Sequence, residues 1–172
     1  MKVVGLAGWS NAGKTTLLTK LLPYWTERGL RVSTIKHAHH DFDIDVPGKD
    51  SWLHRKAGAQ EVMVCADQRW VLMHELREEA PPSIQEMLAK MTPVDLVVVE
   101  GFKYAPYHKI EVHRAAAGKP LLYPEDKQIV GIATDAVIDG GFPVAPLDDI
   151  PAVAAMAEAA AMLVKDLQVE QL

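Results

Sequence analysis

Hydrophobic residues occur along this chain in two alternating patterns. After a first apolar run, such residues recur at helical spacing from Leu17 to Trp25, ahead of a helix stop at Gly29. We expect Pro23 to kink this helix, because its ring removes one backbone hydrogen bond. Short, nearly continuous apolar runs, typical of strands buried on both faces, lie at residues 3–7, 96–99 and 129–133. Strands that alternate with helices predict an α/β fold in which helices flank a mostly parallel sheet.

The remaining pattern predicts the other elements. Further strands are expected at residues 31–36, 62–64 and 70–73, and helices from residue 50 or 51 and over residues 83–91. Residues 109–114 alternate between apolar and polar, which is typical of a half-exposed strand at a sheet edge, and such an edge can pair with a second copy. A C-terminal amphipathic helix is expected to bury Val153, Met156, Ala160, Leu163 and Leu167.

Composition narrows the classes of protein that fit. No linker, repeat or low-complexity tract divides the sequence, so we expect one domain over residues 1–172. The net charge of −5 gives no general affinity for nucleic acid or anionic membranes. The longest apolar stretches fall far short of the roughly 20 residues of a membrane span, and no secretory signal precedes the first strand. The single cysteine, Cys65, excludes an intramolecular disulfide. We therefore expect a cytoplasmic protein that binds neither nucleic acid nor membrane.

Residues 8–15 match the phosphate-binding pattern G-x-x-x-x-G-K-[ST] without a mismatch, between a buried strand and an amphipathic helix. In such a P-loop the backbone N–H groups and the start of the helix face the phosphate oxygens. Lys14 is expected to reach the β and γ phosphates, Thr15 to bind Mg²⁺, and Thr16 to contact the α-phosphate. The pattern therefore predicts a P-loop NTPase whose nucleotide-binding residues are Gly8, Ser10, Asn11, Ala12, Gly13, Lys14, Thr15 and Thr16.

A magnesium-dependent P-loop protein also needs an acidic group at the end of a neighbouring strand. The apolar run at residues 96–99 is flanked by two acids, Asp95 and Glu100. Because ligands bind at the carboxyl ends of parallel strands, we expect Glu100 to serve the metal and Asp95 to be solvated. Lys14 and Glu100 are thus the candidate catalytic residues, and Asp50 is a further candidate for the metal.

Thr134 and Asp135 follow the apolar run at residues 129–133. A carboxylate at this position can accept hydrogen bonds from the N1–H and N2–H groups of guanine, and adenine offers no such pair of donors. The two residues are therefore candidates for base recognition in favour of guanine. A Thr-Asp pair is equally typical of an ordinary turn or helix cap.

Residues 37–50 contain three histidines and four aspartates. Three interpretations stay open for this segment. It can be a loop that contacts the nucleotide or a partner, a transition-metal site, or a solvated polar loop, and the ligand spacing selects none of them.

Taken together, these segments resemble the molybdopterin-guanine dinucleotide biosynthesis protein B (MobB) family. The blocks that carry the resemblance are residues 8–17, 36–51, 55–59, 99–103, 109–114 and 133–135. The resemblance implies a homodimeric protein that binds GTP with Mg²⁺ and hydrolyses it slowly. It also implies a partner, the MobA-type guanylyltransferase that joins GMP to molybdopterin. Two alternatives remain: a small-molecule kinase that uses the same P-loop, and a non-catalytic carrier that binds the pterin or the partner enzyme.

Overall fold

The computed structural model describes residues 1–38, 42–102, 105–138 and 141–167. It divides into two compact units, the first formed by Met1–His37 and Ile84–Leu172 and the second by Ala38–Ser83. The sequence analysis treated residues 1–172 as one domain, and the two units are described in turn below. Within the described ranges, none of the helices has the length and apolar character that a membrane-spanning helix requires.

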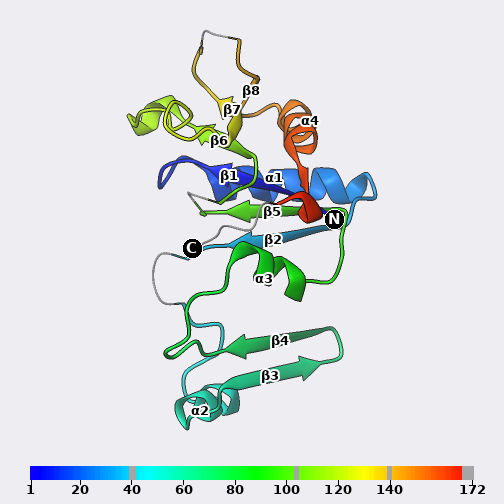
Figure 1. Ribbon diagram of the computed structural model, residues 1–172, viewed down its shortest axis with the longest axis vertical. Helices are drawn as coiled ribbons and strands as arrows, with labels where there is room; N and C mark the ends of the chain where they lie inside the picture. Colours follow the sequence, from blue (N-terminus) through cyan, green and yellow to red (C-terminus); the bar gives the residue numbers. More distant parts are fainter. Residues whose placement is uncertain (39–41, 103–104, 139–140, 168–172) are drawn as a thin grey trace. The chain divides into compact units, whose positions relative to one another are not determined.

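The first unit is built on a mostly parallel sheet with strand order β2-β5-β1-β6-β7-β8, to which β9 adds antiparallel to β1 (Figure 1). Helices flank this sheet, which confirms the predicted α/β fold class. The elements of this unit are β1 (Lys2–Ala7), α1 (Lys14–Glu27), β2 (Val32–Lys36), α3 (Ile84–Lys90), β5 (Leu96–Glu100), β6 (Lys109–His113), β7 (Ile129–Thr134), β8 (Val144–Pro146), α4 (Ile150–Ala160) and β9 (Met162–Leu163).

Each face of this sheet packs against its own set of helices. Successive residues of a strand point to opposite faces. Val4 and Val98 accordingly belong to the cluster that includes α1 and α4, and Val3 and Val97 to the cluster that includes α3. All four valines are completely buried, which holds β1 and β5 rigidly at the centre of the unit. α1 runs as one helix through Pro23, and the kink predicted there stays a prediction.

The strand predicted at residues 109–114 is present as β6, but its predicted place at an edge of the sheet is wrong. β6 lies between β1 and β7, and every residue from Lys109 to Val112 is buried. Its polar side chains have partners in the interior. The Lys109 ammonium pairs with Asp126 at 2.8 Å, and the Glu111 carboxylate accepts backbone N–H bonds from residues 122 and 123 at 2.7 and 2.9 Å. Burial raises the pKa of Glu111 above its ordinary value. The alternation therefore reflects paired polar groups in the interior rather than a solvated face.

The predicted C-terminal helix is shorter than expected. α4 begins after Asp149, whose carboxylate accepts the Ala152 N–H at 3.0 Å as an N-terminal cap, and it ends at Ala160. Leu163 instead lies in β9, paired with Lys2 of β1, and Leu167 packs in the cluster around α3. Neither β8 nor β9 was predicted from the sequence.

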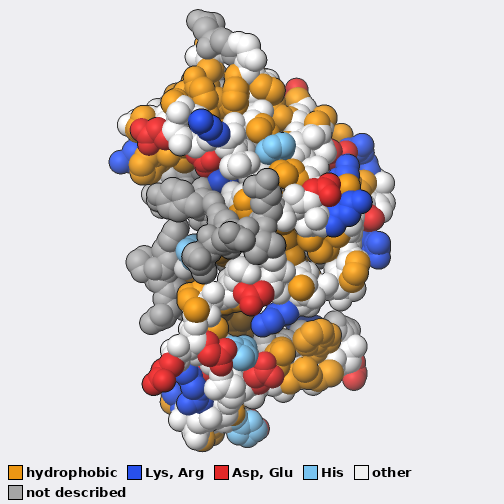
Figure 2. Space-filling view, viewed as in Figure 1, with side chains coloured by type: hydrophobic (Ala, Val, Ile, Leu, Met, Phe, Trp, Pro, Cys, Tyr) orange, Lys and Arg blue, Asp and Glu red, His pale blue; other side chains and the backbone are white. Residues whose placement is uncertain are grey.

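The second unit consists of α2 (Asp50–Lys56) and the antiparallel hairpin of β3 (Glu61–Ala66) and β4 (Arg69–His74). The sequence predicted the helix and both strands, and the structure adds their antiparallel pairing. Arg55 ties it together, because its guanidinium pairs with Asp43, Asp45 and Glu75 at 2.6, 2.8 and 3.3 Å. A hydrogen bond to Asp45, followed by one to Asp43, raises the pKa of Arg55. Figure 2 shows hydrophobic side chains gathered over the β3–β4 hairpin.

Candidate functional site

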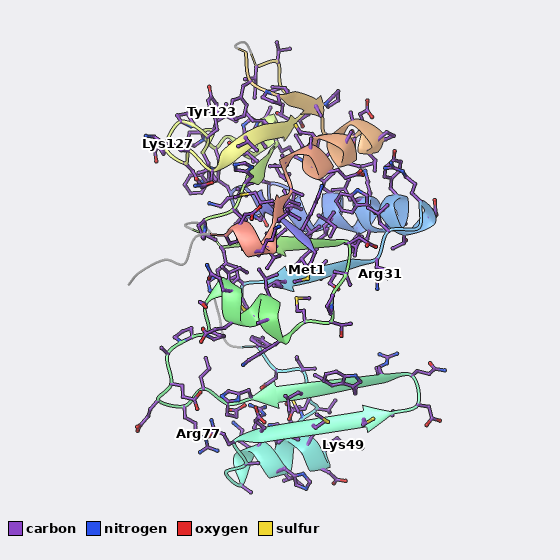
Figure 3. The ribbon with its side chains drawn as sticks, turned by 45° about the vertical axis from the view of Figure 1, so that its right-hand side comes forward. Met1, Arg31, Lys49, Arg77, Tyr123 and Lys127 are labelled. Atoms are coloured by element: carbon purple, nitrogen blue, oxygen red, sulfur yellow. The ribbon has the colours of Figure 1, made fainter. Side chains whose placement is uncertain are left out.

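The carboxyl ends of the parallel strands meet at one edge of the first unit's sheet. In the order of the strands, this edge carries Lys36 as the last residue of β2, Glu100 as the last residue of β5, the Gly8 turn after β1, Arg114 after β6 and Asp135 after β7. The opposite edge carries the amino ends of the strands, where Figure 3 shows Met1 and Arg31. Ligands of open α/β sheets bind beyond the carboxyl ends, so this edge is the candidate site.

The turn between β1 and α1 has the backbone that a phosphate-binding loop requires. Gly8 and Gly13 adopt φ angles of 143° and 94°, which side chains with a Cβ rarely adopt. A Cβ on Gly8 would also lie 2.5 Å from the carbonyl oxygen of Val112. α1 begins at Lys14, directly after the second glycine, so the unpaired N–H groups of its first turn lie next to the loop.

This turn borders a cavity of about 470 Å³, within the range of small-molecule sites. The cavity is lined by Ser10, Asn11, Gly13, Lys14, Thr15, Thr16, Lys36 and Glu100. Two predicted nucleotide contacts, Gly8 and Ala12, shape the turn instead of lining the cavity. Ala12 is buried, and its N–H donates to the carbonyl of Trp9 at 3.2 Å.

Lys14 lies over its own loop. Its ammonium donates hydrogen bonds to the carbonyl oxygens of Gly8 and Trp9, each at 2.9 Å. These bonds hold a positive charge at the wall of the cavity, next to the backbone N–H groups of the turn. Phosphate oxygens are stronger acceptors than neutral carbonyls, because a bond between two charged groups is roughly twice as strong as a neutral one.

Thr15 and Glu100 form a second pair in the cavity. The Thr15 hydroxyl donates to the Glu100 carboxylate, with Oγ1–Oε1 and Oγ1–Oε2 distances of 3.0 and 3.3 Å. Glu100 lines the cavity and is only 8% exposed, so its carboxylate has little contact with bulk water. Asp95 lies at the other end of β5 and accepts the backbone N–H of Arg31 at 2.8 Å. Of the two acids only Glu100 lies at the cavity, and its service to a metal stays a prediction.

The Thr15–Glu100 pair fits a magnesium ion that arrives with a nucleotide. Both groups offer oxygen ligands, and the threonine lone pairs remain available to a cation while its proton is donated to Glu100. In the described part of the chain, no three His, Cys, Asp or Glu side chains cluster as a metal site of their own. Phosphate oxygens and waters would therefore complete the coordination of Mg²⁺.

Asp50 and the polar loop belong to the second unit. Asp50 begins α2, and its role as a metal ligand stays a prediction. Asp43 and Asp45 are engaged by Arg55, which gives these two acids a structural role. His39, His40 and Asp41 lie outside the described residues.

Asp135 is linked to the phosphate-binding turn through an arginine that sequence analysis assigned no role. Its carboxylate accepts the Ala115 N–H at 2.7 Å and lies 3.6 Å from the Arg114 guanidinium. The same guanidinium lies beside the turn, 3.6 Å from a Cβ built on Gly13. Asp135 does not line the cavity, so base recognition by this residue stays a prediction.

Thr134 has an internal role in the structure. It is 3% exposed, and its hydroxyl bonds with the His113 ring at 2.9 Å and accepts the Ala136 N–H at 3.0 Å. These contacts fix the turn that carries Asp135. Such hydrogen bonds are typical of an ordinary turn, the alternative that the sequence analysis gave for Thr134 and Asp135.

Trp9 also contacts a distant segment. Its indole N–H donates to the Pro120 carbonyl at 2.8 Å, and the Lys119 ammonium lies 5.9 Å from the centre of its ring. The sequence analysis assigned no role to Trp9 or Lys36. Lys36 could have been identified from the sequence as Glu100 was, because it also lies at the end of a predicted strand.

Comparison with known proteins adds information on ancestry. Residues 3–135 match the family model of molybdopterin guanine dinucleotide synthesis protein B, MobB. The chain is 39% identical over 155 residues to the molybdopterin-guanine dinucleotide biosynthesis adapter protein of Escherichia coli (strain K12), with 88% of this chain and 89% of that protein covered. It is also 39% identical over 153 residues to the adapter protein of the same name from Haemophilus influenzae, with 88% and 85% covered.

Solved structures are similar as well. The crystal structure of a molybdopterin-guanine biosynthesis protein B aligns with a TM-score of 0.72 at 27% identity, covering 90% of this chain and 96% of that one. Bacillus subtilis MobB aligns with a TM-score of 0.72 at 22% identity, covering 94% and 99%, which bears on the fold alone.

Proposed function

Since the chain belongs to the molybdopterin guanine dinucleotide synthesis protein B family, we propose that it is a Mg²⁺-dependent GTP-binding protein of molybdenum cofactor assembly. In this proposal it hydrolyses GTP slowly and assists, as an adapter, a MobA-type guanylyltransferase that joins GMP to molybdopterin. The observation that carries the proposal is the cavity where Lys14 and the Thr15–Glu100 pair meet. A cytoplasmic location remains part of the proposal.

The triphosphate is held mainly by the backbone of the turn. The N–H groups of Asn11 and of Gly13 to Thr16 donate to the phosphate oxygens, helped by the dipole of α1, whereas the Ala12 N–H stays bonded to the Trp9 carbonyl within the turn. Lys14 exchanges its two carbonyl acceptors for oxygens of the β and γ phosphates. The loop therefore carries its cation already at the wall of the cavity that the nucleotide enters.

Hydrolysis requires in-line attack of water on the γ-phosphorus and cleavage of its bond to the β–γ bridging oxygen. Negative charge then develops on the leaving GDP, and Lys14 with the N–H groups of the turn stabilises that charge. Thr15 and Glu100 would hold Mg²⁺, which would supply further positive charge to stabilise the phosphate oxygens. Among the described residues that line the cavity, Glu100 is the only carboxylate, and it accepts the Thr15 hydroxyl. Because these lining residues offer no second base to activate the attacking water, we expect slow turnover.

Guanine recognition is assigned to Asp135. Replacing Asp135 with asparagine should weaken GTP binding selectively and relax discrimination against xanthosine triphosphate, because the amide can no longer accept both guanine donors. Calorimetry with GTP, ATP and xanthosine triphosphate measures this change. Equal losses for ATP and GTP would show instead that Asp135 acts by holding Arg114 and Ala115.

The homodimer is assigned to the β3–β4 hairpin. Its register puts Met63, Cys65, Trp70 and Leu72 on the same face. Met63 and Trp70 are 62% and 65% exposed, whereas Val62 on the other face is buried. A two-stranded hairpin is marginal by itself, and a second copy that covers this apolar face supplies the missing burial.

Replacing Trp70 with glutamate should therefore weaken dimerisation by at least about thirtyfold, the size of a tryptophan hot spot. Light scattering over a dilution series measures the dimer population. Val137→Glu is the matched control, because Val137 is a 94% exposed valine of the first unit. A dimer of unchanged strength in the Trp70 variant would place the interface elsewhere.

The two alternatives are separated by simple assays. A small-molecule kinase needs an acceptor, so steady phosphate release from GTP alone would exclude it. A carrier needs no hydrolysis, so cofactor transfer that survives loss of nucleotide binding would favour it over the proposed function.

A further inference from the structure

Lys36 lies at the end of β2 and lines the same cavity as the phosphate-binding turn. β2 pairs with β5 in parallel, and the register sets Lys36 directly opposite Glu100. The next residue continues the ladder, because the His37 N–H donates to the Glu100 carbonyl at 2.8 Å. The sheet therefore fixes the backbone of Lys36 one strand spacing, about 4.8 Å, from that of the acid.

The side chain of Lys36 has a charge that no side chain among the described residues neutralises. It is exposed at the cavity, and the described part of the chain gives it no hydrogen bond or ion pair. Lys14 differs, since its ammonium binds two carbonyl oxygens of its own loop. A flexible lysine without a competing partner is able to reach an anion bound in the cavity.

The position of Lys36 selects which phosphate it meets. The strand order is β2-β5-β1, so β5 with Glu100 lies between β2 with Lys36 and the turn that follows β1. The Thr15–Glu100 pair marks the γ-phosphate end of the site, where a P-loop holds its metal, and Thr16 marks the α-phosphate end. A cation on the far side of Glu100 therefore faces the terminal phosphate rather than the nucleoside.

We propose that Lys36 binds the γ-phosphate and so makes this site prefer GTP to GDP. The inference rests on the proposed function, because it assumes a guanine nucleotide in the cavity. Lys36 thereby adds a contact from outside the P-loop that serves the terminal phosphate alone, whereas Lys14 is shared between the β and γ phosphates. Loss of that phosphate on hydrolysis removes the contact, so GDP is bound without Lys36.

The test is calorimetry of Lys36→Gln with GDP and with a non-hydrolysable GTP analogue, in the presence of Mg²⁺. We expect about a tenfold loss of affinity for the analogue, the size of one charge-assisted hydrogen bond. Affinity for GDP should be unchanged within about twofold, and Lys36→Arg, which keeps the charge, should retain most of the affinity for the analogue.

Lys2→Gln is the matched control, because Lys2 pairs with Leu96 at the opposite end of β5 and the variant makes the same change in net charge. Both affinities should be unchanged in this variant. Equal losses for the two nucleotides in Lys36→Gln, or no loss, would overturn the inference. Lys14→Ala is measured in the same series. If it keeps full affinity for both nucleotides the proposed function fails, whereas if it loses affinity and Lys36→Gln does not, only the inference fails.

Discussion

Replacing Lys14 with alanine should weaken GTP binding by about 2 kcal/mol or more, roughly thirtyfold. The Lys14 ammonium lies at the wall of the cavity on two carbonyl oxygens of its own loop, 2.9 Å away. The variant removes the cation that the triphosphate would take over from those carbonyls. It leaves the glycine-dependent shape of the turn in place, because that shape depends on Gly8 and Gly13. Titration calorimetry with GTP and Mg²⁺ measures the loss.

Lys20→Ala is the matched control for this variant. Lys20 lies on the same helix, but its side chain is 51% exposed and pairs with Asp148 on the surface. An exposed pair of this kind contributes little to stability, so GTP affinity should not change. A Lys14 variant that binds GTP as tightly as the wild type would refute the assignment of the turn as a phosphate site.

Replacing Glu100 with glutamine should reduce Mg²⁺-dependent GTP hydrolysis by about 10- to 100-fold, as expected when a group that supports a metal loses its charge. The amide oxygen can still accept the Thr15 hydroxyl, so the hydrogen bond at 3.0 Å has a substitute. The lost quantity is the negative charge beside the metal. Phosphate release over a magnesium titration measures the change, and the magnesium concentration needed for half-maximal rate should rise.

Asp95→Asn is the matched control, because it removes an acid from the other end of the same strand. Hydrolysis should be unchanged.

The hydrogen bond from the Arg31 backbone, followed by that from the Arg31 side chain, lowers the pKa of Asp95. Its ionised form thus stabilises the fold above the ordinary aspartate pKa, and this contribution is lost as the pH falls through the lowered value. Thermal melts at neutral pH separate that stability effect from activity. Equal hydrolysis by wild type and the Glu100 variant would remove Glu100 from the metal site.

The parts of the fold that follow from local pattern were predictable. The apolar runs that became β1, β5 and β7 are buried on both faces, and they read as strands without knowledge of their neighbours. The position of Glu100 followed from one topological rule, since a strand next to β1 that runs parallel to it must end at the same edge.

Elements that depend on distant partners were not predictable. Lys109 and Glu111 resemble solvated residues in the sequence, because the groups that pair with them lie at Asp126 and in the backbone of residues 122 and 123. The helical spacing of Leu163 and Leu167 continued past the true end of α4. The residues after that end pair instead with the distant strand β1, where Lys2 lies opposite Leu163 and Val3 lies opposite Met162.

The candidate site divides in the same way. The turn is encoded by contiguous residues, so its glycines, Lys14 and Thr15 were identified from the pattern alone. Arg114 becomes significant only when Asp135 and Gly13 are seen on either side of its guanidinium. Lys36 likewise acquires a role from its register with Glu100. The sequence shows that each of these side chains ends or follows a strand, but only the strand order shows which of them are neighbours.

The central claim is that the cavity binds GTP, and nucleotide competition by calorimetry with Mg²⁺ tests it most directly. The account predicts that GTP binds at one site per chain and that ATP displaces it only at concentrations at least about tenfold higher, because the base is recognised by an acceptor that adenine does not match. Equal affinity for ATP and GTP, or no binding of either nucleotide, would contradict it.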